Sequence, residues 1–322
     1  MGMMDVPESD YSETVEEVIA PMAIDAVIVE ARTKLRNSTS IEDARIVVQT
    51  ARSITILTGA GISAESGIPT YRDENGLWSK YKAEDFSSVD AFARDPQTVW
   101  DWYRDRRIVM GDAKPNAGHL ALAAIEQQSL QCTLFTQNID GLHQQAGSRY
   151  VTEMHGSAWK LRCTECLEEW TDMGSLPDLP RCSHCRGLAR PAVVWFGEKL
   201  SQKSMGDAMR AMRCDVLLVV GTSGLVNPVA SLIPLARQYK AQIIEVNLAE
   251  TEVTQYADFS LFGKASEILP QLAEPGQHGV VLQADMGRAF ERAMNKFFAK
   301  YPELKRKPTD EMVDTNQPSM LK

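Results

Sequence analysis

The sequence lacks the features that direct a chain into or across a membrane. The most apolar run near the amino terminus, Ile19 to Ala31, contains Pro21 and Asp25 and is too short to span a bilayer. The opening residues MGMMDVPESDYSETVEEV are too acidic for a transit peptide, and they lack the basic-then-apolar order of a secretion signal. We therefore expect a cytoplasmic protein with no membrane partner.

Positive charge is also scarce. The 322 residues carry 34 Lys and Arg against 43 Asp and Glu, a net charge of −9. Such a field does not attract a nucleic-acid backbone, so we expect no direct nucleic-acid partner. A hydrophobic content of 44% with 24% charged residues is typical of a soluble globular protein, and we find no internal repeat. The length allows one large domain or two.

Cysteine is infrequent, but four of the six cysteines are clustered. Cys132 and Cys214 adjoin strand-like runs, so we expect buried free thiols there in a reducing compartment. The other four follow the spacing Cys-x2-Cys-x15-Cys-x2-Cys, which predicts one Zn²⁺ ion held by four thiolates with no open position for chemistry. These ligands are Cys163, Cys166, Cys182 and Cys185.

Short apolar runs alternate with helical stretches along most of the chain. This pattern predicts an α/β fold whose parallel sheet is covered on both faces. The expected strands are Ile54 to Leu57, Cys132 to Thr136, Val216 to Val220, Ile243 to Val246 and Phe259 to Phe262. Two sections, about residues 72–110 and 156–191, interrupt the alternation, and we expect them to form a small lobe around the zinc module 163–185.

The two ends of the chain differ from the middle. Residues 1–40 are predicted to be an N-terminal helical extension, with an amphipathic helix over 12–35. Residues 41–275 form the expected catalytic domain. Residues 276–322 are predicted to contain one more amphipathic helix followed by a polar, mobile tail.

A glycine-rich turn follows the first expected strand. Residues 58–64, TGAGISA, satisfy the G-x-G-x-x-A form of the dinucleotide fingerprint, although the match alone is also compatible with a tight turn. Gly221-Thr222-Ser223 and Asn247 follow two other strands, and ligands bind at such carboxyl ends. The acidic residue that usually binds the ribose hydroxyls at the end of the next strand is not evident, since Glu84 and Asp85 fall in a helical section. An ordinary dehydrogenase is therefore not expected.

Several longer motifs identify a family. GAGISAESGIPTYRD, TQNIDGLH, MHG, the four cysteines, VVWFGE, GTS and EVN occur in the order and spacing of the sirtuins, NAD-dependent protein lysine deacylases. The resemblance covers about Ile41 to Leu272. It implies a Rossmann-like doubly wound parallel sheet, a small zinc-binding lobe and an active site in the cleft between them. Tyr71 stands where many relatives carry Phe.

The resemblance also implies the chemistry. In sirtuins the acyl oxygen of a modified lysine attacks the nicotinamide ribose of NAD, and the products are nicotinamide and O-acyl-ADP-ribose. His155 would be the base that activates the ribose hydroxyls, for which an imidazole is suited near neutral pH. Asn138 and Asp140 would act at the nicotinamide and its ribose, although Asn-x-Asp is also ordinary turn chemistry. His119 and His143 are expected to be structural.

The resemblance places further residues around NAD and the substrate. The expected NAD contacts are Gly59, Ala60, Gly61, Ile62, Ser63, Tyr71, Arg72, Trp78, Gln137, Asn138, Ile139, Asp140, Gly221, Thr222, Ser223, Asn247, Leu248, Ala249 and Ala265. The run Val193 to Glu198 would offer a strand edge to an acylated-lysine peptide or protein, unless it is a simple hairpin strand. The substrate contacts expected there are Val193, Val194, Trp195, Phe196 and Gly197.

One arginine suggests the kind of acyl group. Arg106 has only aromatic or apolar residues at helical pairing distance, whereas Arg104 has Asp101 three residues before it. Arg106 therefore covers apolar surface, finds a remote acid or awaits an anionic ligand. Tyr103 and Arg106, with the small Ala83, resemble the class III sirtuins, which remove malonyl, succinyl or glutaryl groups. In these enzymes Arg binds the distal carboxylate and Tyr adds a hydroxyl donor.

Three other functions stay open from the sequence. The protein could be an ordinary lysine deacetylase in which Arg106 is structural. It could be a mono-ADP-ribosyltransferase that uses the same NAD site. It could also be a non-catalytic NAD-sensing scaffold, against which the complete set of His155, Asn138 and Asp140 argues.

Overall fold

The computed structural model describes residues 40–71, residue 82 and residues 85–274. The expected N-terminal extension and C-terminal helix lie outside the described residues, as do Arg72, Trp78 and Ala83. None of the described helices has the length and hydropathy that crossing a bilayer requires.

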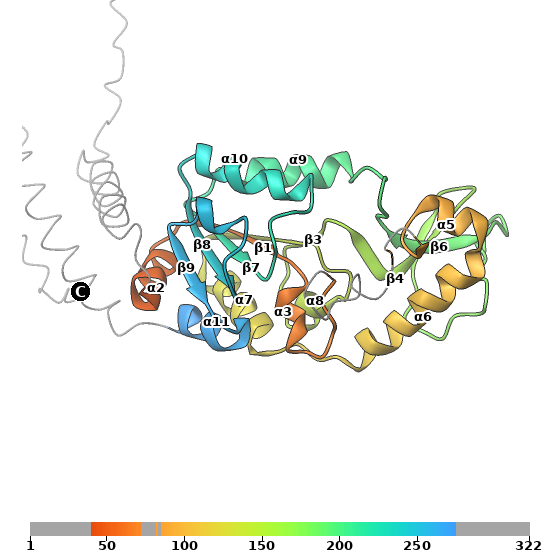
Figure 1. The fold of residues 1–322 in the computed structure, drawn as a ribbon, viewed down its shortest axis with the longest axis horizontal. Helices are drawn as coiled ribbons and strands as arrows, with labels where there is room; N and C mark the ends of the chain where they lie inside the picture. Colours follow the sequence, from red (N-terminus) through yellow and green to blue (C-terminus); the bar gives the residue numbers. More distant parts are fainter. Residues whose placement is uncertain (1–39, 72–81, 83–84, 275–322) are drawn as a thin grey trace, which may run out of the picture. The chain divides into compact units, whose positions relative to one another are not determined.

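In the described residues, the larger domain is built on a six-stranded sheet with the strand order β3-β2-β1-β7-β8-β9. The strands are β1 (Ser53–Thr58), β2 (Gln131–Thr136), β3 (Val151–Glu153), β7 (Val216–Val220), β8 (Gln242–Asn247) and β9 (Phe259–Phe262). Every neighbouring pair is parallel. The order reverses between β1 and β7, so the expected doubly wound parallel sheet is confirmed (Figure 1). All five expected strands form, and β3 is a sixth that the apolar pattern did not predict.

Both faces of this sheet are covered, as continuous apolar strands require. In β7, Val216, Leu218 and Val220 pack into one hydrophobic cluster, while Leu217 and Val219 belong to a second. The helices of the first cluster are α2 (Ile41–Gln49), α7 (Ala117–Gln128) and α11 (Ala265–Ala273), and those of the second are α9 (Gln202–Ala211) and α10 (Leu232–Gln238). Figure 1 shows the two groups on opposite sides of the strands.

The smaller lobe joins the two sections that interrupt the alternation. Its antiparallel sheet has the order β5-β4-β6. The elements are α5 (Val89–Arg94), α6 (Pro96–Asp112), β4 (Gly156–Cys163), β5 (Glu169–Thr171) and β6 (Ala189–Val193). A core that includes Trp100, Tyr103, Leu161 and Trp195 packs the helices on this sheet. The indole N–H of Trp100 also donates to the Ala189 carbonyl at 2.9 Å, which ties α6 to β6.

Backbone geometry at the start of β4 generates a stability prediction. Gly156 has φ +76°, and an added Cβ would lie 2.0 Å from the Ala192 carbonyl oxygen, whereas Gly147 has φ +98° with nothing within 4 Å. We expect Gly147→Ala to lower the free energy of unfolding by about 1–2 kcal/mol, the cost of a side chain at positive φ. Gly156→Ala should cost at least about 2 kcal/mol more, since the strands must also separate. Urea denaturation of both variants measures this, and equal losses would contradict it.

Candidate active site

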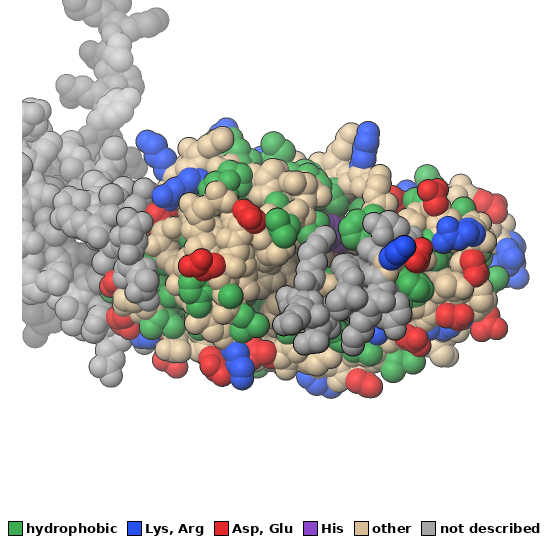
Figure 2. Space-filling view, viewed as in Figure 1, with side chains coloured by type: hydrophobic (Ala, Val, Ile, Leu, Met, Phe, Trp, Pro, Cys, Tyr) green, Lys and Arg blue, Asp and Glu red, His purple; other side chains and the backbone are tan. Residues whose placement is uncertain are grey.

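A cavity of about 590 Å³ opens at the carboxyl ends of β1, β2, β7 and β8. The loops after these strands form one wall, and the end of β6 with residues 194–198 forms part of another. Ligands of open α/β sheets bind at this edge, where the strand order reverses. On the face drawn in Figure 2, the described part carries charges of both signs interspersed.

Two glycine-rich turns meet at the base of the cavity. The N–H of Gly61 donates to the Gly221 carbonyl at 2.9 Å, and that of Gly59 donates to the Val220 carbonyl at 3.0 Å. A Cβ on Gly59 would lie 2.7 Å from the Gly221 oxygen, so no side chain fits between the turns. This close-packed backbone, with only small side chains facing the cavity, fits the pyrophosphate of a dinucleotide.

Asn138 and Asp140 are held together by Ser63. The Ser63 hydroxyl donates to Asp140 Oδ2 at 2.8 Å and accepts from Asn138 Nδ2 at 3.2 Å. Asn138 Nδ2 also donates to the Gly59 carbonyl at 3.1 Å, which fixes this side chain to the glycine turn. Burial raises the pKa of Asp140, against the hydrogen bonds from the Leu142 N–H and from Ser63. The amide and the carboxyl are therefore placed before any ligand binds.

Two buried histidines lie behind this network. His119 and His143 are 0% and 1% exposed, and their ring centroids are 5.0 Å apart. His143 Nε2 lies 2.9 Å from the Thr58 hydroxyl, and His119 Nε2 lies 3.4 Å from that of Ser63. Burial lowers the pKa of His119 to about 4, and burial with the neighbouring His119 lowers that of His143 to about 3. Both are neutral near pH 7.

His155 lines the cavity between β3 and β4. Its Nδ1 lies 3.0 Å from the Gln137 carbonyl oxygen. A carbonyl only accepts, so Nδ1 carries the hydrogen and, in the neutral ring, Nε2 keeps its lone pair. The side chain can therefore take a proton at Nε2.

Comparisons with known proteins agree with this geometry. Residues 59–228 match the Sir2 family. A protein of Pyrobaculum aerophilum named NAD-dependent protein deacylase 2 is 45% identical over 230 residues, which are 71% of this chain and 92% of that protein. The chain belongs to the Sir2 family. The expected sirtuin membership is thus confirmed.

Two solved structures extend the comparison to ligands. A Sir2 homolog–NAD complex is 41% identical, covers 77% of this chain and 94% of its own, and has a TM-score of 0.68. A structure described as Sir2-p53 peptide-NAD+ is 31% identical, covers 72% and 97%, and has a TM-score of 0.66. The expectation of NAD as the cofactor agrees with these complexes.

Most of the residues expected at the Sir2-family site line the cavity. From the expected NAD contacts these are Gly59, Ala60, Gly61, Tyr71, Gln137, Asn138, Ile139, Gly221, Thr222, Ser223, Asn247, Leu248, Ala249 and Ala265. From the expected substrate contacts they are Tyr103, Val193, Val194, Trp195, Phe196 and Gly197. Ile62, Ser63, Asp140 and Arg106 are not part of its lining. Ile62 packs in the core, while the Ser63 hydroxyl hydrogen-bonds both Asp140 and the cavity-lining Asn138.

The strand expected at the substrate wall is shorter than the sequence indicated. The run Val193 to Glu198 is not a continuous strand, since β6 ends at Val193 and Phe196 makes only an isolated bridge to Ser88. Gly197, at φ +86°, turns the chain there. The Trp195 N–H is used inside this turn, where it donates to Glu198 Oε2 at 2.8 Å.

Ser87 and the residues that extend the turn after β7 were not predicted from the sequence. Ser87 lines the cavity beside Tyr103, as do Leu225, Val226, Asn227 and Pro228 farther along the chain. Ser87 lies in a section without apolar periodicity. The continuation GLVNP of the Gly221-Thr222-Ser223 turn was a usable signal, because loops after strands at the switch point tend to contact ligand.

Helix α6 contributes Tyr103 to the wall of the cavity. Tyr103 is 3% exposed, and its hydroxyl accepts from Trp195 Nε1 at 2.9 Å and lies 3.4 Å from Ser87 Oγ. Burial raises the pKa of Tyr103. Arg106, one turn later, has its guanidinium 5.0 Å from the centre of the Trp102 ring.

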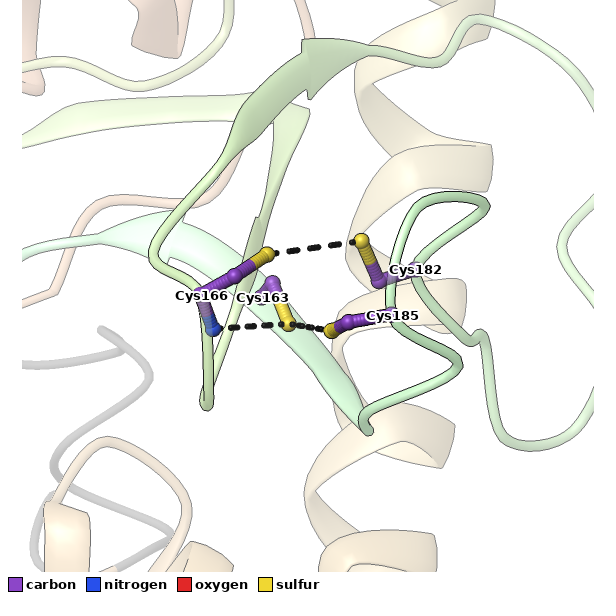
Figure 3. Close-up of side chains that lie close together, drawn as sticks. All are labelled: Cys163, Cys166, Cys182 and Cys185. Atoms are coloured by element: carbon purple, nitrogen blue, oxygen red, sulfur yellow. Dashed lines mark hydrogen bonds between the residues drawn. The ribbon is translucent and has the colours of Figure 1, made fainter.

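The four expected zinc ligands converge in the small lobe (Figure 3). Their Sγ atoms lie within 4.8 Å of one another, and Cys163 Sγ is 3.4 Å from Cys185 Sγ. A tetrahedral ion with Zn–S bonds of about 2.3 Å needs sulfur separations of about 3.8 Å, so the arrangement fits Zn²⁺. Backbone N–H groups of Glu165 and Cys166 point at Cys163 Sγ, which favours the thiolate. None of the four cysteines lines the cavity, so this arrangement agrees with a structural zinc ion.

We expect one zinc ion per chain in the purified protein. Cys182→Ser should release it and unfold the small lobe, because a structural zinc contributes folding free energy directly. Cys132→Ser removes a buried thiol outside the cluster and should retain the metal. Metal analysis together with thermal denaturation tests both. A cooperatively folded, reduced protein with less than about half an equivalent of zinc would rule the site out.

The two buried histidines predict how stability depends on pH. Their folded pKa values lie below the unfolded value of about 6.5, so the unfolded chain binds more protons as pH falls from about 6.5 to 4. The free energy of unfolding should therefore drop by up to about 1.4 kcal/mol per pH unit for each histidine. His143→Gln should lessen this slope relative to wild type. Urea denaturation at several pH values measures it, and identical slopes would disprove the assignment.

Proposed function

We propose that this chain is an NAD-dependent protein lysine deacylase that prefers acyl groups ending in a carboxylate, such as succinyl or malonyl. Membership of the Sir2 family and the names of its relatives support the deacylase activity. The preference rests on one observation, the pairing of Tyr103 at the cavity wall with Arg106 one helical turn away.

Arg106 is a cation for which the described residues supply no anionic partner. Its Nε is buried and has no hydrogen-bond partner, and it makes no ion pair with any residue that the structure describes. Burial raises the pKa of Tyr71, and the positive charge of the Arg106 guanidinium partly offsets this rise. Tyr71 itself lines the cavity. A carboxylate at the end of an acyl chain would satisfy this guanidinium in bidentate fashion, with the Tyr103 hydroxyl as a further donor.

The reacting end of the site is served by other residues. When bound, NAD supplies the nicotinamide–ribose bond that the acyl oxygen attacks. His155 takes a proton from a ribose hydroxyl at Nε2, while the Gln137 carbonyl holds its Nδ1 hydrogen and so fixes the ring. Asn138, which Ser63 and Gly59 hold, presents the amide side chain at the cavity wall. One water is consumed to break the bond between the acyl carbon and the lysine nitrogen, and the products are nicotinamide, O-acyl-ADP-ribose and the free lysine.

The decisive experiment compares acyl groups on one peptide. The protein is incubated with NAD and matched acetyl-, succinyl- and malonyl-lysine peptides, and the products are followed by mass spectrometry. We expect Arg106→Met to lower kcat/KM for the succinyl peptide by about ten- to hundredfold, because a charge-assisted hydrogen bond contributes about 1.5–3 kcal/mol. Deacetylation should change little, since an acetyl group carries no distal charge. Tyr103→Phe should act in the same direction but more weakly.

Arg104→Met provides the matched control. Arg104 lies on the same helix, but it already pairs with Asp101 at 2.5 Å, so its loss should leave the ratio of the two activities unchanged. His155→Ala should lower turnover of every peptide by about 10²–10⁴-fold while NAD still binds. Equal losses of both activities in Arg106→Met would favour the ordinary deacetylase.

A further inference from the structure

The Tyr103 hydroxyl does not stand free at the cavity wall. The indole Nε1 of Trp195 lies 2.9 Å from it, and the two side chains are 2% and 3% exposed. An indole N–H only donates, so the phenol oxygen must be the acceptor. The hydrogen of the Tyr103 hydroxyl is therefore directed to another partner.

That other partner is weak in the absence of a substrate. Ser87 Oγ is 3.4 Å from the phenol oxygen, at the long end of the hydrogen-bond range, and Ser87 lines the same cavity. A carboxylate oxygen is a stronger acceptor, and O–H···O⁻ bonds shorten to about 2.5–2.7 Å. We therefore expect the Tyr103 hydroxyl to donate its hydrogen to the carboxylate of an acidic acyl group in place of Ser87.

The indole that imposes this direction is itself fixed. The Arg190 guanidinium lies 3.4 Å from the centre of the Trp195 ring, and Arg190 holds both carboxylate oxygens of Glu198 at 2.7 and 2.8 Å. Glu198 in turn accepts the backbone N–H of Trp195 at 2.8 Å. The Phe92 ring packs at a centroid distance of 5.4 Å. The ring cannot turn its N–H away from Tyr103 without breaking this arrangement.

We propose that Trp195 is a positioning residue for acyl specificity, which orients the Tyr103 hydroxyl to donate to the distal carboxylate of the substrate. The Arg190–Glu198 pair holds the indole in the required place. This inference rests on the proposed preference for acidic acyl groups. It explains how the Tyr103 hydroxyl, one of the two donors to the distal carboxylate, is oriented.

A double-mutant cycle tests the coupling. Wild type, Trp195→Phe, Tyr103→Phe and the double variant are assayed with NAD and matched succinyl- and acetyl-lysine peptides. Trp195→Phe should lower the succinyl-to-acetyl ratio of kcat/KM by about two- to tenfold, the loss expected for one hydrogen bond. In the Tyr103→Phe background the same change should shift the ratio by less than about twofold. The loss should appear in the KM for the succinyl peptide, because the contact exists in the bound substrate.

Trp100→Phe is the matched control for a merely structural effect. Trp100 is 1% exposed in the same lobe and also donates its indole N–H, but to the Ala189 carbonyl. It should lower the thermal midpoint as Trp195→Phe does and leave the ratio unchanged.

If Trp195→Phe does not fold, the benzothiophene analogue of tryptophan placed at position 195 keeps the ring shape and removes only the N–H. It should show the same fall in the ratio. An unchanged ratio, or equal falls with and without the Tyr103 hydroxyl, overturns the positioning role while leaving the acidic preference intact. A wild-type protein that removes acetyl but not succinyl overturns the proposed preference, and this inference with it.

Discussion

The close approach of the turns after β1 and β7 is the constraint on which the site depends. Gly61 donates to the Gly221 carbonyl at 2.9 Å, and a Cβ on either Gly59 or Gly61 would lie 2.7 Å from atoms of Gly221. The turns can meet only because β1 and β7 are parallel neighbours at the point where the strand order reverses. This contact also brings the Gly59 carbonyl within 3.1 Å of Asn138 Nδ2, so the turn that fits a pyrophosphate also orients the Asn138 amide.

The polar groups behind the cavity form one connected set rather than separate contacts. The Thr58 hydroxyl at the end of β1 donates to that of Thr136 at the end of β2 and lies 2.9 Å from His143. Parallel strands end at the same edge, which is why these side chains meet. Burying a polar group without a hydrogen-bond partner costs free energy, so each group of this connected set restrains the position of its neighbours. His143 Nδ1 is an exception, since it is buried without a hydrogen-bond partner.

The sequence predicted the sheet better than the cavity walls. Strands such as Val216–Val220 are apolar at every position because both faces are covered, and this signal is local. β3 is three partly buried residues, Val-Thr-Glu, whose pairing with β2 depends on tertiary context. The run VVWFGE was expected to offer a strand edge, but β6 ends at Val193, and the Glu198 carboxylate accepts the Trp195 N–H in the turn that follows. A side chain that competes for a backbone N–H is not visible in apolar periodicity.

One pair of strands in the small lobe links His155 to Trp195, the residue that contacts Tyr103. His155 directly precedes β4 and Trp195 follows β6 by two residues. Gly156 pairs with Val193, and the Val194 N–H donates to the His155 carbonyl at 2.9 Å. The positions of His155 and of Trp195, which contacts Tyr103, are therefore set by the same register.

The zinc module acts at the other end of this strand pair. Cys163 is the last residue of β4 and pairs with Ala189, the first residue of β6. The irregular pairing between Gly156 and Leu161 leaves the middle of the two strands weakly specified. Four thiolates on one ion would clamp Cys163 to the segment that leads into β6. A metal with no open coordination position can in this way fix the register that aligns His155 with Trp195, although none of its ligands touches the cavity.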